Sequence, residues 1–137
     1  MLELGLSYEK GLIFLKDIAK KEDISEKYLS QIIVPLKAAG LVNSFRGARG
    51  GYILAKAPAE ITLKDIFEIL EGNLAIVGCL NNPSECSRVP ICVTRDLWCE
   101  LGEVIAEKLS SITLKDLVVR FQKKQEGIQE NTVVWAI

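Results

Sequence analysis

Three cysteines, Cys79, Cys86 and Cys92, lie within a stretch of 14 residues, with six residues between the first two and five between the last two. The residues between them show neither a helical nor a strand period, and Pro83 and Pro90 would interrupt either element. We therefore expect an irregular loop. A loop of this length in a small domain is unusual unless something orders it, and thiolates that converge on a metal centre would do so.

The spacing of the three thiols favours an iron–sulfur cluster. Zinc sites commonly use paired cysteines separated by about two to four residues, whereas thiolate ligands must surround the larger body of a cluster. Zinc binding and unliganded thiols are the alternatives. A fourth ligand is not evident, because Cys99 would lie about 10 Å beyond Cys92 along a helix. Arg95, one turn after Cys92, is always protonated and cannot ligate a metal.

The composition, with 49% hydrophobic and 26% charged residues in a chain of 137, suits one globular domain or a small domain with a helical extension. No apolar run reaches the roughly 20 residues that a membrane span needs. No secretory signal is present either, so we expect a cytoplasmic protein with no membrane partner. The chain has no histidine and no evident nucleophile–base or carboxylate pair, which argues against an enzyme.

The elements ahead of the cysteines predict a helix-turn-helix. A short helix over 16–21 is followed by a turn and by a second helix over 26–40, which Ser25 caps. One side of the second helix is apolar. The other side carries Lys27, Tyr28, Ser30 and Gln31. In a helix-turn-helix the first turns of the second helix face base edges in the major groove, which such side chains can bond. An ordinary helical hairpin with a solvated face is the alternative.

A basic, glycine-rich hairpin follows at once. Short strands are expected over 41–45 and 52–55, and Arg46, Arg49 and Gly50 lie between them in the sequence RGARGG. No acidic residue occurs from 41 to 59, although the net charge of the whole chain is −1. The glycines permit a tight turn, and the arginines can reach phosphates or a narrow minor groove. A nucleotide-phosphate loop would need a helix just after the glycines, whereas a strand follows, so a winged helix is favoured.

The rest of the chain is expected to be mainly helical. A helix over 61–72 begins at Thr62, with Asp65 in the reciprocal capping position, and the same letters ITLKD recur at 112–116. We interpret the recurrence as two uses of one capping solution rather than as a structural repeat. The longest uninterrupted helical pattern runs from Thr94 to Ile112, and its wide apolar stripe predicts a helix of about 18 residues and about 27 Å. We expect this helix to pair with its twin in a homodimer.

The predicted fold is therefore mainly α, a winged helix-turn-helix with a two-stranded wing and a long C-terminal dimerisation helix. The DNA-binding domain is expected over 1–72, the cysteine-rich loop over 73–93, the dimerisation helix with a short helix after it over 94–124, and a C-terminal tail over 125–137. The opening residues, 1–9, have no capping residue before them, and we interpret them as the second half of a helix that starts upstream.

These features resemble a known family, the small winged-helix regulators that include IscR, NsrR, RirA and CymR, and within it the motifs are nearest to the iron–sulfur cluster regulator IscR. The shared marks are ISEKYLSQIIVPLKAAGLV (24–42), FRGARGGYILA (45–55), EITLKDI (60–66), the three cysteines and RDLW (95–98). They extend over nearly the whole chain. The resemblance implies a dimeric transcription regulator that binds double-stranded operator DNA and whose cluster senses iron–sulfur supply, redox state or nitric oxide.

The resemblance also implies roles for single residues. Tyr28, Ser30 and Gln31 would face bases, and Arg46 and Arg49 would act in the wing. Cys79, Cys86 and Cys92 would hold the cluster, with [2Fe–2S] favoured and [4Fe–4S] left open. The sequence departs from the family pattern at Arg95, where IscR-like members carry histidine, and in lacking the short basic segment that precedes their first helix. A small redox or electron-transfer protein, a zinc-binding regulator and a cluster-free regulator are the alternatives.

Overall fold

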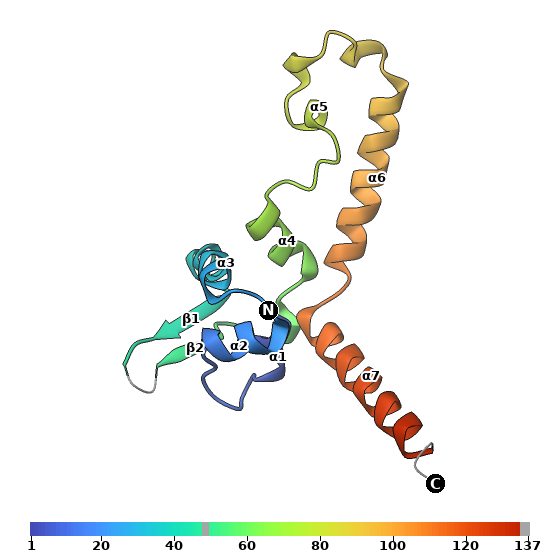
Figure 1. Ribbon diagram of the computed structural model, residues 1–137. Helices are drawn as coiled ribbons and strands as arrows, with labels where there is room; N and C mark the ends of the chain where they lie inside the picture. Colours follow the sequence, from blue (N-terminus) through green and yellow to red (C-terminus); the bar gives the residue numbers. More distant parts are fainter. Residues whose placement is uncertain (48–49, 135–137) are drawn as a thin grey trace.

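The computed structural model describes residues 1–47 and 50–134, with residues 129–134 described by their backbone alone. The elements, in chain order, are α1 (Leu2–Leu6), α2 (Leu15–Glu22), α3 (Glu26–Ala38), β1 (Val42–Phe45), β2 (Gly51–Leu54), η1 (Pro58–Glu60), α4 (Leu63–Glu71), α5 (Gly78–Asn81), η2 (Pro83–Glu85), η3 (Val89–Ile91), α6 (Val93–Ser110) and α7 (Leu114–Val134). Figure 1 shows a body built from α1 to α3 and the two strands, an arm that carries α5 and α6, and α7, which leaves the body in a different direction from the arm.

The body is a winged helix-turn-helix, which confirms the predicted fold class. Strand β1 pairs with β2 in antiparallel register, with Val42 opposite Leu54 and Phe45 opposite Gly51. One continuous core joins the helices to the strands. Its buried side chains are Leu4, Leu15, Ile18, Ala19, Leu29, Ile33, Leu36, Leu41, Val42, Leu54, Ile61, Ile66 and Leu114. Because Leu114 is the first residue of α7, the C-terminal helix is anchored in the core of the DNA-binding body.

The two ITLKD segments lie against each other at the centre of the molecule. Thr62 and Thr113 form an antiparallel β-bridge. In it the Leu63 N–H donates to the Ile112 carbonyl at 2.9 Å, and the Leu114 N–H donates to the Ile61 carbonyl at 2.8 Å. Each threonine also begins a helix with its own aspartate, so α4 and α7 start from one shared junction. This confirms the prediction that both ITLKD segments cap a helix in the same way. The sequence did not predict that the two segments pair with each other.

Two predicted elements differ in the structure. The segment over 73–93 is not irregular throughout, because it contains the single turn of α5 and the short turns η2 and η3. The prolines that were expected to interrupt structure instead occupy the first turns of η2 and η3, where a missing N–H costs nothing. The short helix expected after the dimerisation helix, within 94–124, continues to Val134, because the residues that follow Phe121 are mostly good helix formers such as Gln, Lys and Glu. The predicted tail is therefore largely helical.

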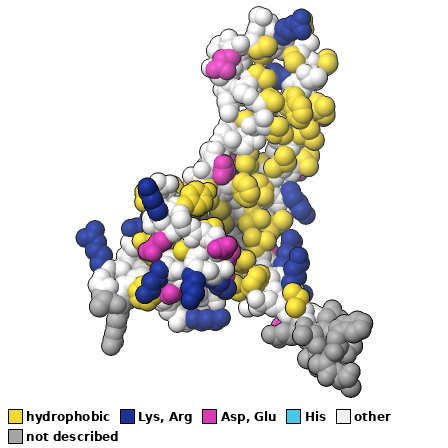
Figure 2. All heavy atoms as spheres, viewed as in Figure 1, with side chains coloured by type: hydrophobic (Ala, Val, Ile, Leu, Met, Phe, Trp, Pro, Cys, Tyr) yellow, Lys and Arg dark blue, Asp and Glu magenta, His cyan; other side chains and the backbone are white. Residues whose placement is uncertain are grey.

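Helix α6 matches the predicted length and leaves its apolar stripe exposed. This helix, which the structure describes in full, buries none of its residues. Leu97 is 50% exposed, Leu101 40% and Val104 61%. Figure 2 shows hydrophobic side chains gathered along this arm. Within the described ranges, none of the helices is both long and apolar enough to cross a membrane.

Candidate nucleic-acid interface and cysteine loop

The exposed side of α3 carries the four side chains predicted to contact DNA, which we call the reading face: Lys27, Tyr28, Ser30 and Gln31. Ser25 sets its position, because the Ser25 hydroxyl accepts a hydrogen bond from the Tyr28 N–H at 3.1 Å and so begins the helix. Leu29, Ile33 and Leu36 occupy the opposite side and are buried. The helical period therefore fixes which side chains can meet a groove.

Ser30 has a defined hydrogen-bonding role within this face. Its hydroxyl donates to the Glu26 carbonyl at 2.8 Å, one turn earlier in the helix. With its proton engaged, the oxygen offers lone pairs and can accept from an amino group on a base edge. Gln31 keeps both an amide donor and a carbonyl acceptor, the pair that recognises adenine in the major groove.

The wing places Arg46 in solvent directly after β1. Gly50 is buried at the other end of the turn, and its N–H donates to the Gly47 carbonyl at 2.9 Å. A Cβ at Gly50 would collide with the Phe45 carbonyl oxygen, so the turn requires glycine there. Gly50 thus shapes the wing rather than offering a side chain to DNA. Arg49, also predicted to act in the wing, lies outside the described residues.

A groove separates the reading face from the wing. Ser30 and Gly50, which line it, were predicted from the sequence, whereas Phe14, Lys16 and Phe45 were not. The Lys16 ammonium lies 5.2 Å from the centre of the Phe14 ring, and Phe45 is 54% exposed. The alternation along β1 buries Val42 and leaves Phe45 outward, a signal that could have been read from the period of two. Lys16 adds a cation to the groove between the reading face and the wing.

The cysteine loop (73–93) carries the three predicted ligands at its turns. Cys79 belongs to α5, Cys86 follows η2, and Cys92 is the N-cap of α6. All three are free thiols and partly buried, whereas Cys99 is free and exposed. Among the residues that the structure describes, no three cysteine, histidine, aspartate or glutamate side chains gather closely enough to hold a metal ion. The loop brings the thiols into one region without making them converge.

Cys92 is the thiol best suited to act as a thiolate. Its sulfur lies 3.2 Å from the Thr94 hydroxyl. Hydrogen bonds from that hydroxyl and from the Arg95 N–H at the start of α6 lower the pKa of Cys92 below its ordinary value. Three free thiols on one loop, one of them with a lowered pKa, fit the chemistry of thiolate ligation. In the conformation described here, closing a site around a metal would require the loop to rearrange.

Arg95 and Cys99 lie on the side of α6 that faces α4 and α5. Both line a groove between α4, α5 and α6, together with Asn73 and Asn81. The Nε atom of Arg95 is buried and has no hydrogen-bond partner among the described residues. Cys99 therefore belongs to this groove, while Cys92 caps the helix start.

Comparison with known proteins gives a consistent set of similarities. Residues 1–120 match the Rrf2 family, described as iron-dependent transcriptional regulators. The chain is 39% identical to the transcriptional regulator CymR of Bacillus subtilis over 93% of this chain and 87% of that one. A solved structure of CymR, described as the global cysteine regulator of that organism, covers 87% of each chain with a TM-score of 0.73. The solved structure of IscR from T. potens is 38% identical, covers 90% of this chain and 81% of that one, and has a TM-score of 0.74.

Proposed function

The chain belongs to the Rrf2 family of DNA-binding transcriptional regulators, and from that premise we propose that it is a cytoplasmic homodimer that reads an operator and holds an iron–sulfur cluster in its cysteine loop. Family membership makes it a regulator rather than an enzyme, as the sequence predicted. It also removes the support for a small electron-transfer protein. The likeness to CymR and to IscR is nearly equal, at 39% and 38% identity, so the effector has to be argued from this chain's own residues.

DNA recognition rests on the reading face, with its four polar side chains exposed on α3 beside the wing. In a helix-turn-helix dimer the two reading helices enter successive major grooves about 34–36 Å apart on one side of the duplex. Gln31 and Ser30 supply base-edge contacts, while Lys27, Lys16 and Arg46 neutralise phosphates. Tyr28 is 56% exposed and offers a ring and a hydroxyl to the groove.

The DNA part of the proposal is tested with operator fragments selected by the protein from a random library. Gln31→Ala should reduce the preference for the selected site over a scrambled duplex by about 1–3 kcal/mol, because a bidentate contact to one base is lost. Gln125→Ala, on α7, is the matched control and should leave the preference intact. An unchanged preference in Gln31→Ala would remove this face from recognition.

Cluster binding rests on the partly buried thiols of Cys79, Cys86 and Cys92 and on the lowered pKa of Cys92. These three residues would hold a cluster, with [2Fe–2S] favoured over [4Fe–4S]. When bound, a cluster would supply a centre that responds to redox state, nitric oxide or cluster supply. Ligation by the three cysteines would order the loop that leads into α6. In the proposed dimer, α6 sets the distance between the two reading faces.

The full chain purified without oxygen tests this part. We expect visible absorption with acid-labile sulfide, lost in Cys79→Ser, Cys86→Ser and Cys92→Ser, and retained in the matched variant Cys99→Ser. Operator affinity should differ between the loaded protein and the same protein after the cluster is removed with a chelator. A colourless protein that takes up one zinc per chain would overturn the cluster assignment while leaving DNA recognition in place.

A second candidate is a winged-helix regulator of the same family that holds no cluster. Two observations favour it: the described thiols do not converge, and Arg95 stands at the position where the sequence pattern would suit a fourth ligand. For this candidate the anaerobic protein is colourless, takes up no zinc, and binds its operator equally well before and after chelator treatment.

A further inference from the structure

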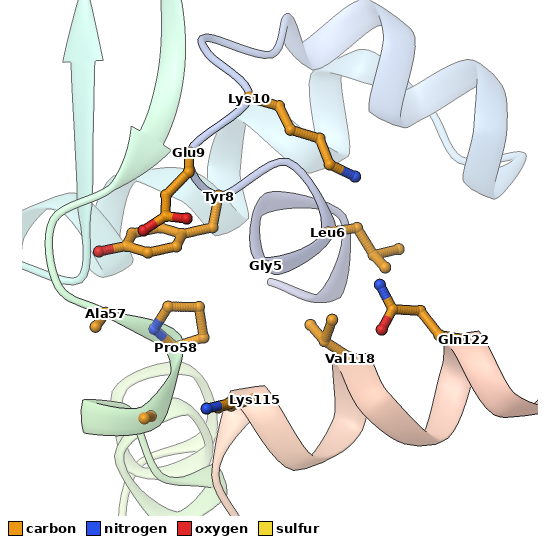
Figure 3. Close-up of a pocket in the computed structure, with 11 residues that line it drawn as sticks. Gly5, Leu6, Tyr8, Glu9, Lys10, Ala57, Pro58, Lys115, Val118 and Gln122 are labelled. Carbon is orange, nitrogen blue, oxygen red and sulfur yellow. The ribbon is translucent and has the colours of Figure 1, made fainter.

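A pocket of about 350 Å³ lies between the end of α1, the segment that follows the wing and the first turns of α7. It is separate from both the reading face and the cysteine loop. Figure 3 shows Leu6, Pro58 and Val118 around it, with the charged ends of Glu9, Lys10 and Lys115 and the amide of Gln122 nearby. An apolar floor with a few polar groups at the rim is the usual composition of a small-molecule site.

The walls of this pocket are held closely. Helices α1 and α7 approach so tightly that a Cβ on Gly5 would lie 2.8 Å from the Val118 Cγ2 atom. The turn after α1 is fixed by the Tyr8 N–H, which donates to the Gly5 carbonyl at 3.3 Å, and by the Lys10 N–H, which donates to the Ser7 carbonyl at 3.0 Å. Glu9 in this turn has a φ of +66°, a left-handed conformation that non-glycine residues rarely adopt. The backbone is therefore strained at the residue that places a carboxylate at the rim.

The charges at the rim select the class of ligand. Lys10 and Lys115 contribute two positive charges and Glu9 one negative charge, so the pocket favours an anion overall. Its floor favours an apolar body. We propose that this pocket binds a small organic acid, with its apolar part against Leu6, Pro58 and Val118 and its carboxylate attracted by the charges of Lys10 and Lys115, which Figure 3 draws on opposite sides of the pocket. A ligand seated there contacts both the DNA-binding body and α7.

The shared chemistry, a carboxylate on an apolar body, is found in plain organic acids and in apolar amino acids. The two sources differ by an ammonium group, for which Glu9 is the available partner. The matched probes are 3-phenylpropionate and phenylalanine, which differ by that group, and 3-phenylpropionamide, which lacks the negative charge.

The experiment is a titration of the full-length chain, labelled at Leu and Val methyl groups, followed by NMR. We expect the methyl signals of Leu6 and Val118 to shift and saturate with 3-phenylpropionate. Affinity for the amide should be at least about tenfold weaker, and Lys10→Gln and Lys115→Gln should each weaken binding of the acid about fivefold to tenfold. Lys124→Gln, farther along α7, is the control and should bind as the parent does.

The relative affinities of the three probes identify the class of ligand. Tighter binding of phenylalanine than of the acid, abolished by Glu9→Gln, supports an amino acid as the ligand, whereas equal or weaker binding supports a plain organic acid. Equal affinity for the amide, or methyl signals that do not move with either carboxylate, overturns the proposal. Because the measurement is made without DNA or a metal, it is independent of the proposed regulatory function.

Discussion

Ser30 and Gln31 show how the chemistry of single side chains divides the work of the reading face. Ser30 donates its proton to the Glu26 carbonyl and is left as an acceptor, while Gln31 can donate and accept at once. The helical period predicted that both residues lie on the polar side of the second helix. It could not predict the engaged proton of Ser30, because that depends on a rotamer.

Arg46 is expected to contact phosphates and not bases. Since it is exposed after β1 and contacts no base in the proposed arrangement, Arg46→Ala should weaken binding of selected and scrambled duplexes alike. The slope of log affinity against log salt should fall by about one. Fluorescence anisotropy at several salt concentrations measures both quantities, with Lys124→Ala as the control. A loss confined to the selected sequence would instead assign Arg46 to base readout.

Cys92 is the N-cap of α6, and Arg95 lies in the first turn of that helix. The two residues have opposite effects on metal binding. Hydrogen bonds from the Thr94 hydroxyl and the Arg95 N–H lower the pKa of the Cys92 thiol, which favours metal binding. The guanidinium of Arg95 cannot ligate, and its buried Nε lacks a partner among the described residues. The sequence predicted that Arg95 is no ligand. Its burial came from the packing of α6 against α4 and α5.

The capping boxes explain why α4 and α7 begin where they do. In each box the aspartate Oδ2 atom accepts from the backbone N–H and the hydroxyl of the threonine, at 2.9 and 2.7 Å for Asp65 and at 2.8 and 2.7 Å for Asp116. These bonds to the ionised form lower the pKa of both carboxyls. Because the bonds join residues three apart, the pattern Thr-x-x-Asp in the sequence marks where each helix starts.

Asp65 therefore makes stability depend on pH. A carboxyl whose pKa is lower in the folded protein than its ordinary value of 3.8 stabilises the fold above that value, and the contribution is lost as the pH falls through the folded pKa. Asp65→Asn should lower the free energy of unfolding at about pH 7, and the gap to the parent should close below about pH 4. Urea unfolding across this range is the measurement. Glu68→Gln, which breaks an exposed pair with Lys64 at 3.7 Å, should change little.

The close contact between α1 and α7 leaves no room for a side chain at Gly5. Gly5→Ala introduces a Cβ 2.8 Å from Val118 Cγ2 and should lower the free energy of unfolding by about 1–3 kcal/mol through overpacking. Adding Val118→Ala should recover part of the loss, because it removes the colliding methyl group. Gly127→Ala, where the new Cβ meets nothing within 4 Å, should instead stabilise α7 by about 0.5–1 kcal/mol. Thermal or urea unfolding of the four chains distinguishes a local clash from a general intolerance.

For the whole molecule, the stripe on α6 is the main feature that a single chain leaves unexplained. Leu97, Leu101 and Val104 are 40–61% exposed, while the opposite side of α6 faces α4 and α5. Exposed apolar stripes of this extent mark surfaces that pack against a partner. A second copy, placing its own α6 against this one, would cover the stripe and align two reading faces.

Val104→Lys tests this arrangement. A charge at the centre of the stripe should shift the protein from dimer to monomer in light scattering and weaken operator binding by about a hundredfold or more, because two linked reading faces bind far better than one. Glu103→Gln changes the charge by the same amount in the groove between α6 and α4, and should keep the parent's mass and affinity. A dimer that persists in Val104→Lys, with unchanged affinity, would place the interface elsewhere.

Much of the architecture followed from local pattern. The helix period, the Ser25 and Thr62 caps and the glycine-rich turn predicted the helix-turn-helix, the wing and the start of α4. The sequence was less successful where a pattern was weak. The turns among the cysteines are too short to show a period, and the polar residues after Phe121 continue α7 by propensity alone.

Local patterns in the sequence were enough to predict the family, the winged-helix body and the side chains that the reading helix exposes, because caps, periods and turns are encoded within a few neighbouring residues. The three-dimensional structure was needed to show that the two ITLKD segments pair, that a charged pocket lies between α1 and α7, and that the described cysteines share a loop without converging. Each of these depends on segments far apart in the chain meeting in space. The packing of these segments depends on the whole core, so it cannot be predicted from a local sequence pattern.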